Sequence, residues 1–186
     1  MPEDRPFKRG MQYTLTAQDQ KLALSMAERR VAAAAKHGHK CVSYSGYDHL
    51  TNHTVGANGE VAFARMAGIE PDTSEPEANR SSLEGRDKKD LIFRGNTINV
   101  KTTDSLSPYL YLLDWFVPPQ FLADFYVLMH GFFPTYRYVG CMRGSELQTP
   151  SRYIKTRHGM RYRAEAGELS VEIPWKRINA QISGAA

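Results

Sequence analysis

The chain has 186 residues, 41% of them hydrophobic and 24% charged, which is typical of one globular domain with its own core. Lys and Arg outnumber Asp and Glu by 24 to 20, and the net charge of +4 mildly favours a polyanionic partner. Its two cysteines exclude a four-cysteine iron–sulfur cluster within the chain and suit a reducing compartment. No apolar run is long enough to cross a membrane, and residues 1–10 lack the apolar core of a signal peptide. We therefore expect a cytoplasmic protein without a membrane partner.

Residues 1–13 are predicted to be a flexible basic arm, and residues 14–186 to form a single domain. A first helix is predicted from Thr16 to about Lys36, because this segment is rich in good helix formers. Thr16 and Asp19 have the spacing of a capping box, in which each residue satisfies the other's backbone at the helix start.

A second helix is predicted from about Asn58 to Ala67, after an irregular polar segment, and Gly68 provides its C-terminal stop. The helix is apolar almost all round, yet Glu60 lies on the same face as its apolar residues. A carboxylate in that position is costly unless it is paired or binds a metal. The alternative is an ordinary acid that complements the positive end of the helix dipole.

Residues 89–103 are predicted to form a β-hairpin, because two apolar-rich runs flank Gly95-Asn96, a pair that suits a type II′ turn. With these two residues as the loop, Asp90 pairs directly with Lys101. Strand alternation then buries Leu91, Phe93, Ile98 and Val100 on one face and places Asp90, Ile92, Asn99 and Lys101 on the other. Taken alone, Asp90 and Lys101 could be a common cross-strand ion pair worth about 0.2–1 kcal/mol.

The C-terminal half is predicted to contain mainly short strands. Strands are expected at 125–130 and 136–142, a short helical turn at 145–147, a second hairpin formed by 160–164 and 169–173, and a terminal helical turn at 174–182. Residues 110–117 suit either a short helix or a strand. The aromatic residues in and around this last segment indicate core or a subunit interface, so a homodimer is also considered.

The residues singled out above resemble, in type and order, the motif of the PD-(D/E)xK nuclease superfamily. The helix that carries Glu60 is followed by the strand that Asp90 opens and then by the segment Asn99-Val100-Lys101-Thr102. The later strands are similar to those of small, phage-type members, so the likeness covers roughly residues 57–147. It implies an α/β fold of the restriction-endonuclease-like type, with a central mixed β-sheet flanked by α-helices. It also implies a host-cytoplasmic location if the gene is carried by a phage.

The resemblance implies hydrolysis of DNA phosphodiester bonds with Mg²⁺ or Mn²⁺. Such a reaction needs a metal to hold the scissile phosphate, a deprotonated water and a group that neutralises developing charge. Metal binding is expected from Asp90, Glu60, the Asn99 side chain and the Val100 carbonyl, because Mg²⁺ prefers oxygen ligands. Lys101 would act on the attacking water, with Asp90 and Glu60 as its catalytic partners, and Thr102 would contact the phosphate.

Asn99 departs from the superfamily pattern, which has Glu or Asp at this position, so the metal site loses one negative charge. A catalytically silent DNA-binding module of the same fold therefore stays open. A protein-interaction subunit without nuclease activity is a further alternative. The Gln-x-x-x-Tyr signature of RecB-like exonucleases is not recognisable, because Asp124 lies four residues after Gln120, and this favours an endonuclease.

A basic segment near the C-terminus is the expected DNA-binding surface. It contains no acid, has Tyr153 and Tyr162 interleaved, and carries the residues Arg152, Lys155, Arg157, Arg161 and Arg163. The alternative is a solvated hairpin face. A second group, His37, His39, Cys41, His49 and His53, has no spacing typical of a zinc site or of an HNH nuclease, and a solvated or DNA-facing loop is expected there.

Overall fold

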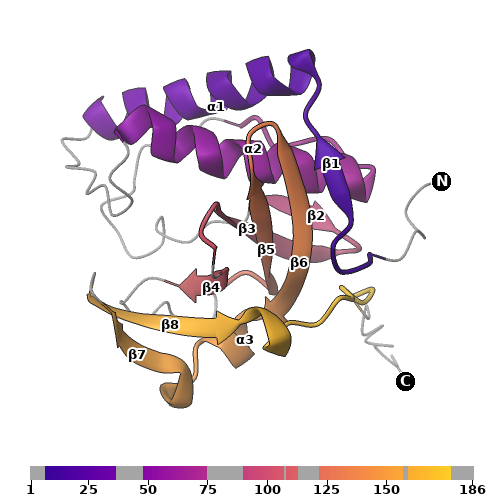
Figure 1. Ribbon diagram of the computed structural model, residues 1–186, viewed down its shortest axis with the longest axis vertical. Helices are drawn as coiled ribbons and strands as arrows, with labels where there is room; N and C mark the ends of the chain where they lie inside the picture. The colour runs from indigo at the N-terminus through magenta and orange to yellow at the C-terminus, as the bar shows by residue number, and fades with distance from the viewer. Residues whose placement is uncertain are drawn as a thin grey trace, which may run out of the picture.

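A central five-stranded sheet organises the computed structural model, which describes residues 7–36, 48–74, 90–106, 108–112, 122–156 and 159–176 (Figure 1). The strand order is β1-β6-β5-β3-β2, in which β3 and β5 run parallel and the other neighbours run antiparallel. The strands are β1 (Gln12–Thr14), β2 (Leu91–Phe93), β3 (Asn96–Thr103), β5 (Phe125–Phe132) and β6 (Thr135–Arg143). The structure is thus mixed α/β with a curled mixed sheet flanked by helices, as predicted at this level.

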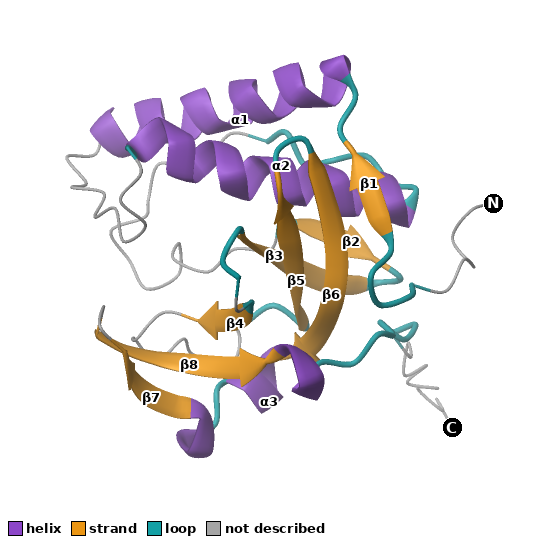
Figure 2. Cartoon of the chain, viewed as in Figure 1, coloured by secondary structure: helices purple, strands orange, loops and turns teal. Residues whose placement is uncertain are grey.

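Two long helices cover one face of this sheet: α1 (Ala17–Lys36) and α2 (His49–Ala67) (Figure 2). The predicted capping box at the start of α1 is confirmed, because Thr16 N donates to Asp19 Oδ2 at 3.1 Å and Asp19 N donates to Thr16 Oγ1 at 3.2 Å. Burial alone would raise the pKa of Asp19, but hydrogen bonds from Thr16, Arg65 and Tyr13 outweigh burial and lower it to about 2. None of the described helices is long and apolar enough to cross a membrane.

The predicted start of α2 at Asn58 is wrong, since the helix begins at His49. Asp48 caps this earlier start by accepting a hydrogen bond from Thr51 N at 2.8 Å. The first half of the helix is polar and the fully buried residues begin at Ala57, so the apolar pattern alone reveals only the second half. The predicted end is confirmed, because Gly68 adopts a left-handed conformation with φ of 70°.

A smaller sheet covers the opposite face of the central sheet, with strand order β4-β8-β7. Its strands are β4 (Tyr109–Leu112), β7 (Tyr153–Thr156) and β8 (Gly159–Glu165). The short helix α3 (Gly144–Leu147) and the 3-10 turns η4 (Pro150–Arg152) and η5 (Ala166–Glu168) complete this layer. Alternate residues of β5 face the two layers, so Val127 packs on the helix side and Leu128 packs against the small sheet.

Several predicted C-terminal elements are confirmed and one is wrong. The strands at 125–130 and 136–142 and the turn at 145–147 are present. The hairpin of 160–164 with 169–173 does not form, because β8 pairs with β4 and β7 instead, and Ser170 makes an isolated bridge to Cys141. Residues 174–176 are not helical, and residues 113–117 and 177–182 of two further predictions lie outside the described residues.

The N-terminal segment is packed from Phe7 onward, in contrast to the expected flexible arm. The Phe7 ring stacks on Phe63 of α2 with 5.2 Å between centroids, and β1 pairs with β6. Residues 1–6 lie outside the described part of the chain.

The β2–β3 hairpin forms, but its register differs from the prediction by two residues. Leu91 pairs with Ile98 and Phe93 with Asn96, so the turn is Arg94-Gly95, whose φ angles are 51° and 73°. Both angles are positive, as a type I′ turn requires. A shift of two residues preserves strand alternation. The predicted apolar face is therefore buried beside α2, while Ile92 is 57% exposed.

Distant contacts explain this register. The Asn96 side chain donates to the Pro174 carbonyl at 2.7 Å, and Lys176 N donates to the Arg94 carbonyl at 3.0 Å. The C-terminal segment thereby holds Asn96 inside the strand and Arg94 in the turn, although a left-handed conformation is unfavourable for a residue with a side chain.

Candidate active site

Asp90 lies at the edge of the central sheet, immediately before β2. Its backbone N donates to the Ile98 carbonyl at 2.7 Å, and its Oδ2 accepts a hydrogen bond from Val100 N at 2.6 Å. The carboxylate therefore binds the edge of β3 just beyond the N-terminal end of β2. Because the N–H and C=O of one strand residue point toward the same neighbour, the Val100 carbonyl also faces this edge. The strand register pairs Leu91 with Ile98 rather than with Val100, so the predicted direct pairing of Asp90 with Lys101 is wrong.

Glu60 and Lys101 approach Asp90 from the two faces of the sheet. Glu60 is buried on α2, whereas Lys101 extends from β3 toward the small sheet, with its Nζ 5.8 Å from the centroid of the Tyr126 ring. Burial raises the pKa of Asp90 well above its usual range; the negative charge of Glu60 raises it further and Lys101 opposes the rise. Glu60 and Lys101 therefore both lie close enough to Asp90 to affect its ionisation.

Arg30 is the site residue that sequence reasoning missed. Its Nη1 donates to Glu60 Oε1 at 2.7 Å and its Nη2 donates to Glu60 Oε2 at 2.6 Å, so both carboxylate oxygens are engaged in a bidentate pair. Spacing along α1 contains the signal: Asp19, Ala23 and Met26 are buried, and Arg30 follows Met26 by one turn on the same face. An arginine on a buried helix face requires a buried acid, and Glu60 is that acid.

Asn99 is 4% exposed and shares the Lys101 face of β3. Formal charges at the site balance, because Glu60 and Asp90 are matched by Arg30 and Lys101, and Asn99 adds none. Within the described ranges, no three His, Cys, Asp or Glu side chains lie close enough to hold a metal ion. A metal site here would therefore have to be completed by amide and main-chain oxygens.

Thr102 lies apart from this group, because its side chain points to the helix layer. The Thr102 Oγ1 donates a long hydrogen bond of 3.5 Å to the Gly56 carbonyl. A Cβ added at Gly59 would lie 1.9 Å from the Thr102 Oγ1. Thr102 and Gly59 thus form a close helix–sheet contact. The structure brings together Glu60, Asp90, Asn99, Val100 and Lys101, and it leaves the Thr102 hydroxyl on the opposite face from Lys101.

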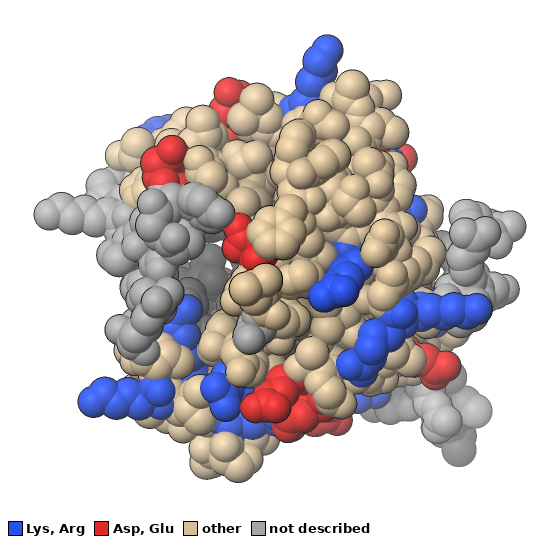
Figure 3. Space-filling view, viewed as in Figure 1, with Lys and Arg blue, Asp and Glu red and all other residues tan. Residues whose placement is uncertain are grey.

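The described members of the expected DNA-binding group lie on the small sheet and on the adjoining turn η4. Arg161 and Arg163 lie over aromatic rings of β4, with Cζ 5.9 Å from the Tyr111 centroid and 4.7 Å from the Tyr109 centroid respectively. Arg152 pairs with an acid, as its Nη1 is 2.9 Å from Glu168 Oε1. Lys155 is exposed on β7, and Arg157 lies outside the described residues. Figure 3 shows basic and acidic side chains side by side in this lower part of the molecule.

The histidine and cysteine group is only partly described. His49 and His53 lie in the first half of α2, and His37, His39 and Cys41 lie outside the described residues.

Comparison with protein-family models, curated proteins and solved structures gave no match. Membership of the PD-(D/E)xK superfamily therefore stays a prediction from the motif residues and their order along the chain.

Proposed function

We propose that this protein is a metal-dependent deoxyribonuclease of the PD-(D/E)xK type, with a restriction-endonuclease-like core, and that it acts as an endonuclease. The observation that carries this proposal is the position of Asp90, whose carboxylate accepts a hydrogen bond from Val100 N at 2.6 Å and whose pKa is affected by both Glu60 and Lys101. Burial and the negative charge of Glu60 both raise the pKa of Asp90, and a divalent cation bound there would offset that effect.

The donors at this edge suit a hard cation. Asp90 and Glu60 supply carboxylates, the Val100 carbonyl faces the same edge, and Asn99 offers an amide, so the residues present would hold Mg²⁺ or Mn²⁺ through oxygen. Bound there, the ion would polarise the scissile phosphate and make a bound water easier to deprotonate.

Lys101 supplies a positive charge on the face of β3 that is turned toward the small sheet, where its side chain is partly exposed. Its ammonium lies over the Tyr126 ring, which restricts its position, and it opposes the pKa rise of Asp90. It can orient the attacking water and neutralise charge that develops on the phosphate. Arg30 acts through Glu60: its two hydrogen bonds fix the carboxylate, so Glu60 must share or release an oxygen before it ligates a metal.

A catalytically silent DNA-binding protein of the same fold is the second candidate. The observation that favours it is the Arg30–Glu60 pair, in which a protein cation already neutralises the acid that would otherwise ligate metal. Asn99 also favours the silent protein, because an amide gives the metal site one negative charge fewer than the Asp or Glu of the superfamily pattern.

Cleavage of linear, nicked, branched and single-stranded DNA with Mg²⁺ or Mn²⁺ tests the proposal. We expect wild-type activity that is lost in Asp90→Asn and Lys101→Ala and is retained in Glu146→Gln, a matched change of an exposed acid on α3. Activity that survives Asp90→Asn would refute the mechanism. DNA binding without cleavage by wild type under either metal would favour the silent alternative.

A further inference from the structure

The small sheet has an outer face that combines aromatic rings with cations. Strand alternation defines this face, because the intervening residues of β4 and β8 pack inward against the central sheet: Leu110, Leu112, Tyr162 and Ala164. The outward residues are Tyr109 and Tyr111 of β4 and Arg161 and Arg163 of β8, and each of them is partly exposed. These four residues are called the tyrosine-arginine face below.

The side chains of the tyrosine-arginine face contact one another in a single layer. The Tyr109 and Tyr111 rings are neighbours, with 5.8 Å between their centroids and 53° between their planes. Arg163 Cζ lies 4.7 Å from the Tyr109 centroid, and Arg161 Cζ lies 5.9 Å from the Tyr111 centroid. These cation–π contacts restrict the position of each guanidinium group, which carries N–H donors along its edge. The face therefore combines flat ring surfaces with positively charged donors.

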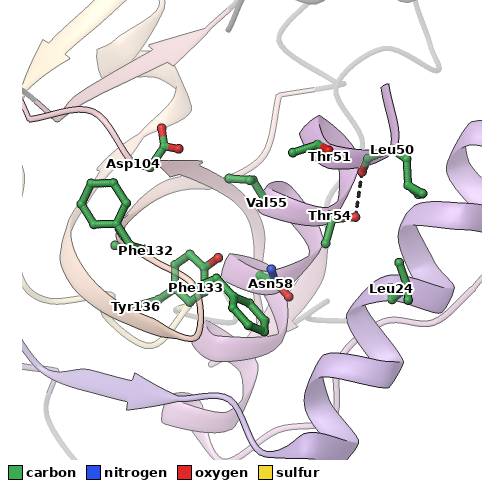
Figure 4. A pocket seen from close by; sticks show the side chains of 11 residues that line it. Leu24, Leu50, Thr51, Thr54, Val55, Asn58, Asp104, Phe132, Phe133 and Tyr136 are labelled. Carbon is green, nitrogen blue, oxygen red and sulfur yellow. Dashed lines mark hydrogen bonds between the residues drawn. The ribbon is translucent and has the colours of Figure 1, made fainter. Parts of the chain in front are cut away.

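The charge of this face suits a phosphate backbone. One acid lies beside it: Arg163 Nη2 is 3.6 Å from Glu165 Oε1, and the Glu165 side chain is 60% exposed, so the pair is weak and screened by salt. A second group of exposed aromatic residues, Phe132 and Phe133, borders a pocket of about 500 Å³ whose described lining includes Asp104 and no basic residue (Figure 4). A polyanion that carries aromatic bases is therefore better matched by the tyrosine-arginine face.

We propose that the tyrosine-arginine face binds single-stranded DNA, so that the nuclease acts on substrates that contain a single-stranded segment. Unstacked bases would lie on the rings of Tyr109 and Tyr111, and the arginines would donate to the phosphates between them. Bases in a duplex are stacked on one another, so rings that lie on the surface of a sheet cannot reach their faces. The choice of DNA as the ligand rests on the proposed function, whereas the binding itself uses none of the residues of the proposed metal site.

Fluorescence anisotropy with labelled oligo(dT) and a duplex of equal length, in EDTA to prevent cleavage, tests the proposal on the full-length protein. Oligo(dT) should bind at least about tenfold more tightly than the duplex at the same salt concentration. Tyr111→Leu should weaken oligo(dT) binding at least about fivefold through the loss of a stacked base, and Tyr111→Phe should retain it. Tyr153→Leu is the matched control and should have no effect, because Tyr153 is an exposed tyrosine on the inward side, where its ring contacts Tyr162.

A salt titration separates stacking from phosphate contact. Tyr111→Leu should leave the slope of log K against log salt unchanged because it removes no charge, whereas Arg163→Gln should reduce the slope for oligo(dT) by about 0.7. Equal affinity for oligo(dT) and duplex, or wild-type binding of oligo(dT) by a Tyr109→Leu and Tyr111→Leu double variant, would overturn the proposal and assign the tyrosine–arginine contacts to the sheet alone.

The two proposals fail in different ways. Cleavage that requires Asp90, by a protein without preference for single strands, would overturn the inference about the tyrosine-arginine face and support the proposed function. Preferential binding of oligo(dT) that depends on Tyr111, without cleavage under Mg²⁺ or Mn²⁺, would support the inference and overturn the proposed nuclease activity.

Discussion

Replacing Arg30 by Met separates the structural role of the Arg30–Glu60 pair from its effect on a metal site. The Arg30 side chain is 21% exposed and that of Glu60 9% exposed, so the substitution leaves a largely buried carboxylate without its counter-charge. Breaking a buried ion pair from one side costs about 3–5 kcal/mol. Because this pair keeps some solvent contact, we expect the free energy of unfolding to fall by about 2–3 kcal/mol.

The same substitution should strengthen metal binding if Glu60 is a ligand. It frees both Glu60 oxygens from hydrogen bonds of about 1.5–3 kcal/mol each in charged pairs, and it removes a positive charge beside Asp90. Recovery of about 1.4 kcal/mol of this interaction would increase Mn²⁺ affinity about tenfold. Glu60→Gln should change affinity in the opposite direction, because it removes the ligand charge itself.

Urea unfolding and calorimetric titration with Mn²⁺ measure the two effects. Arg29→Met is the matched control, since Arg29 is the adjacent arginine on α1 and its Nη1 donates to the Thr73 carbonyl instead. It should leave Mn²⁺ affinity unchanged. If Arg30→Met lowers Mn²⁺ affinity as Glu60→Gln does, Arg30 supports the site rather than competing with the metal. Wild-type stability in Arg30→Met would refute the ion-pair reasoning.

Three further predictions concern stability and DNA binding. Hydrogen bonds lower the pKa of Asp19 to about 2 in the folded protein from its ordinary value of 3.8, so its contribution of about 2 kcal/mol should be present above pH 3.8 and be lost as pH falls through 2. Urea unfolding at pH 4 and pH 2 should show this loss in wild type and not in Asp19→Asn. Gly59→Ala should cost about 1–3 kcal/mol through its clash with Thr102, and Thr102→Ala should restore part of the loss in the double variant; equal thermal unfolding of Gly59→Ala and wild type would contradict the contact. Replacing Arg161 and Arg163 by Ala should weaken DNA binding and reduce the slope of log K against log salt by about 2 if both contact phosphate, and an unchanged slope would assign them to the sheet alone.

The pattern of the hairpin was predictable from sequence, and its register was not. Strand alternation identifies the buried face, because apolar residues at every second position can satisfy only one side of the sheet. Turn choice is different: Gly95-Asn96 and Arg94-Gly95 are both compatible with a two-residue loop and with the same buried face. The decision depends on Pro174 and Lys176, which contact the hairpin only after the chain has folded.

The helix layer shows the same division between local and distant information. The end of α2 follows from Gly68, which has a local conformational preference. The beginning of α2 depends on the Asp48 cap and a polar first half, and neither produces an apolar period. Glu60 is predictable from sequence because it interrupts an apolar helix face. Its partner Arg30 is predictable in the same way, because on α1 it continues the buried line of Asp19, Ala23 and Met26.

The charges around Asn99 explain why a neutral amide suits this buried position. With Arg30 and Lys101 matched against Glu60 and Asp90, the site has a formal charge of zero, so it can be buried without a metal ion. An aspartate or glutamate at position 99 would make the formal charge negative and would add a third acid at a residue that is 4% exposed. Such a set would be costly to bury alone and would depend on a cation for stability. The amide therefore favours a site that folds without metal, and in the proposed nuclease it would bind the metal weakly, with Arg30 holding Glu60 until the metal competed for that carboxylate.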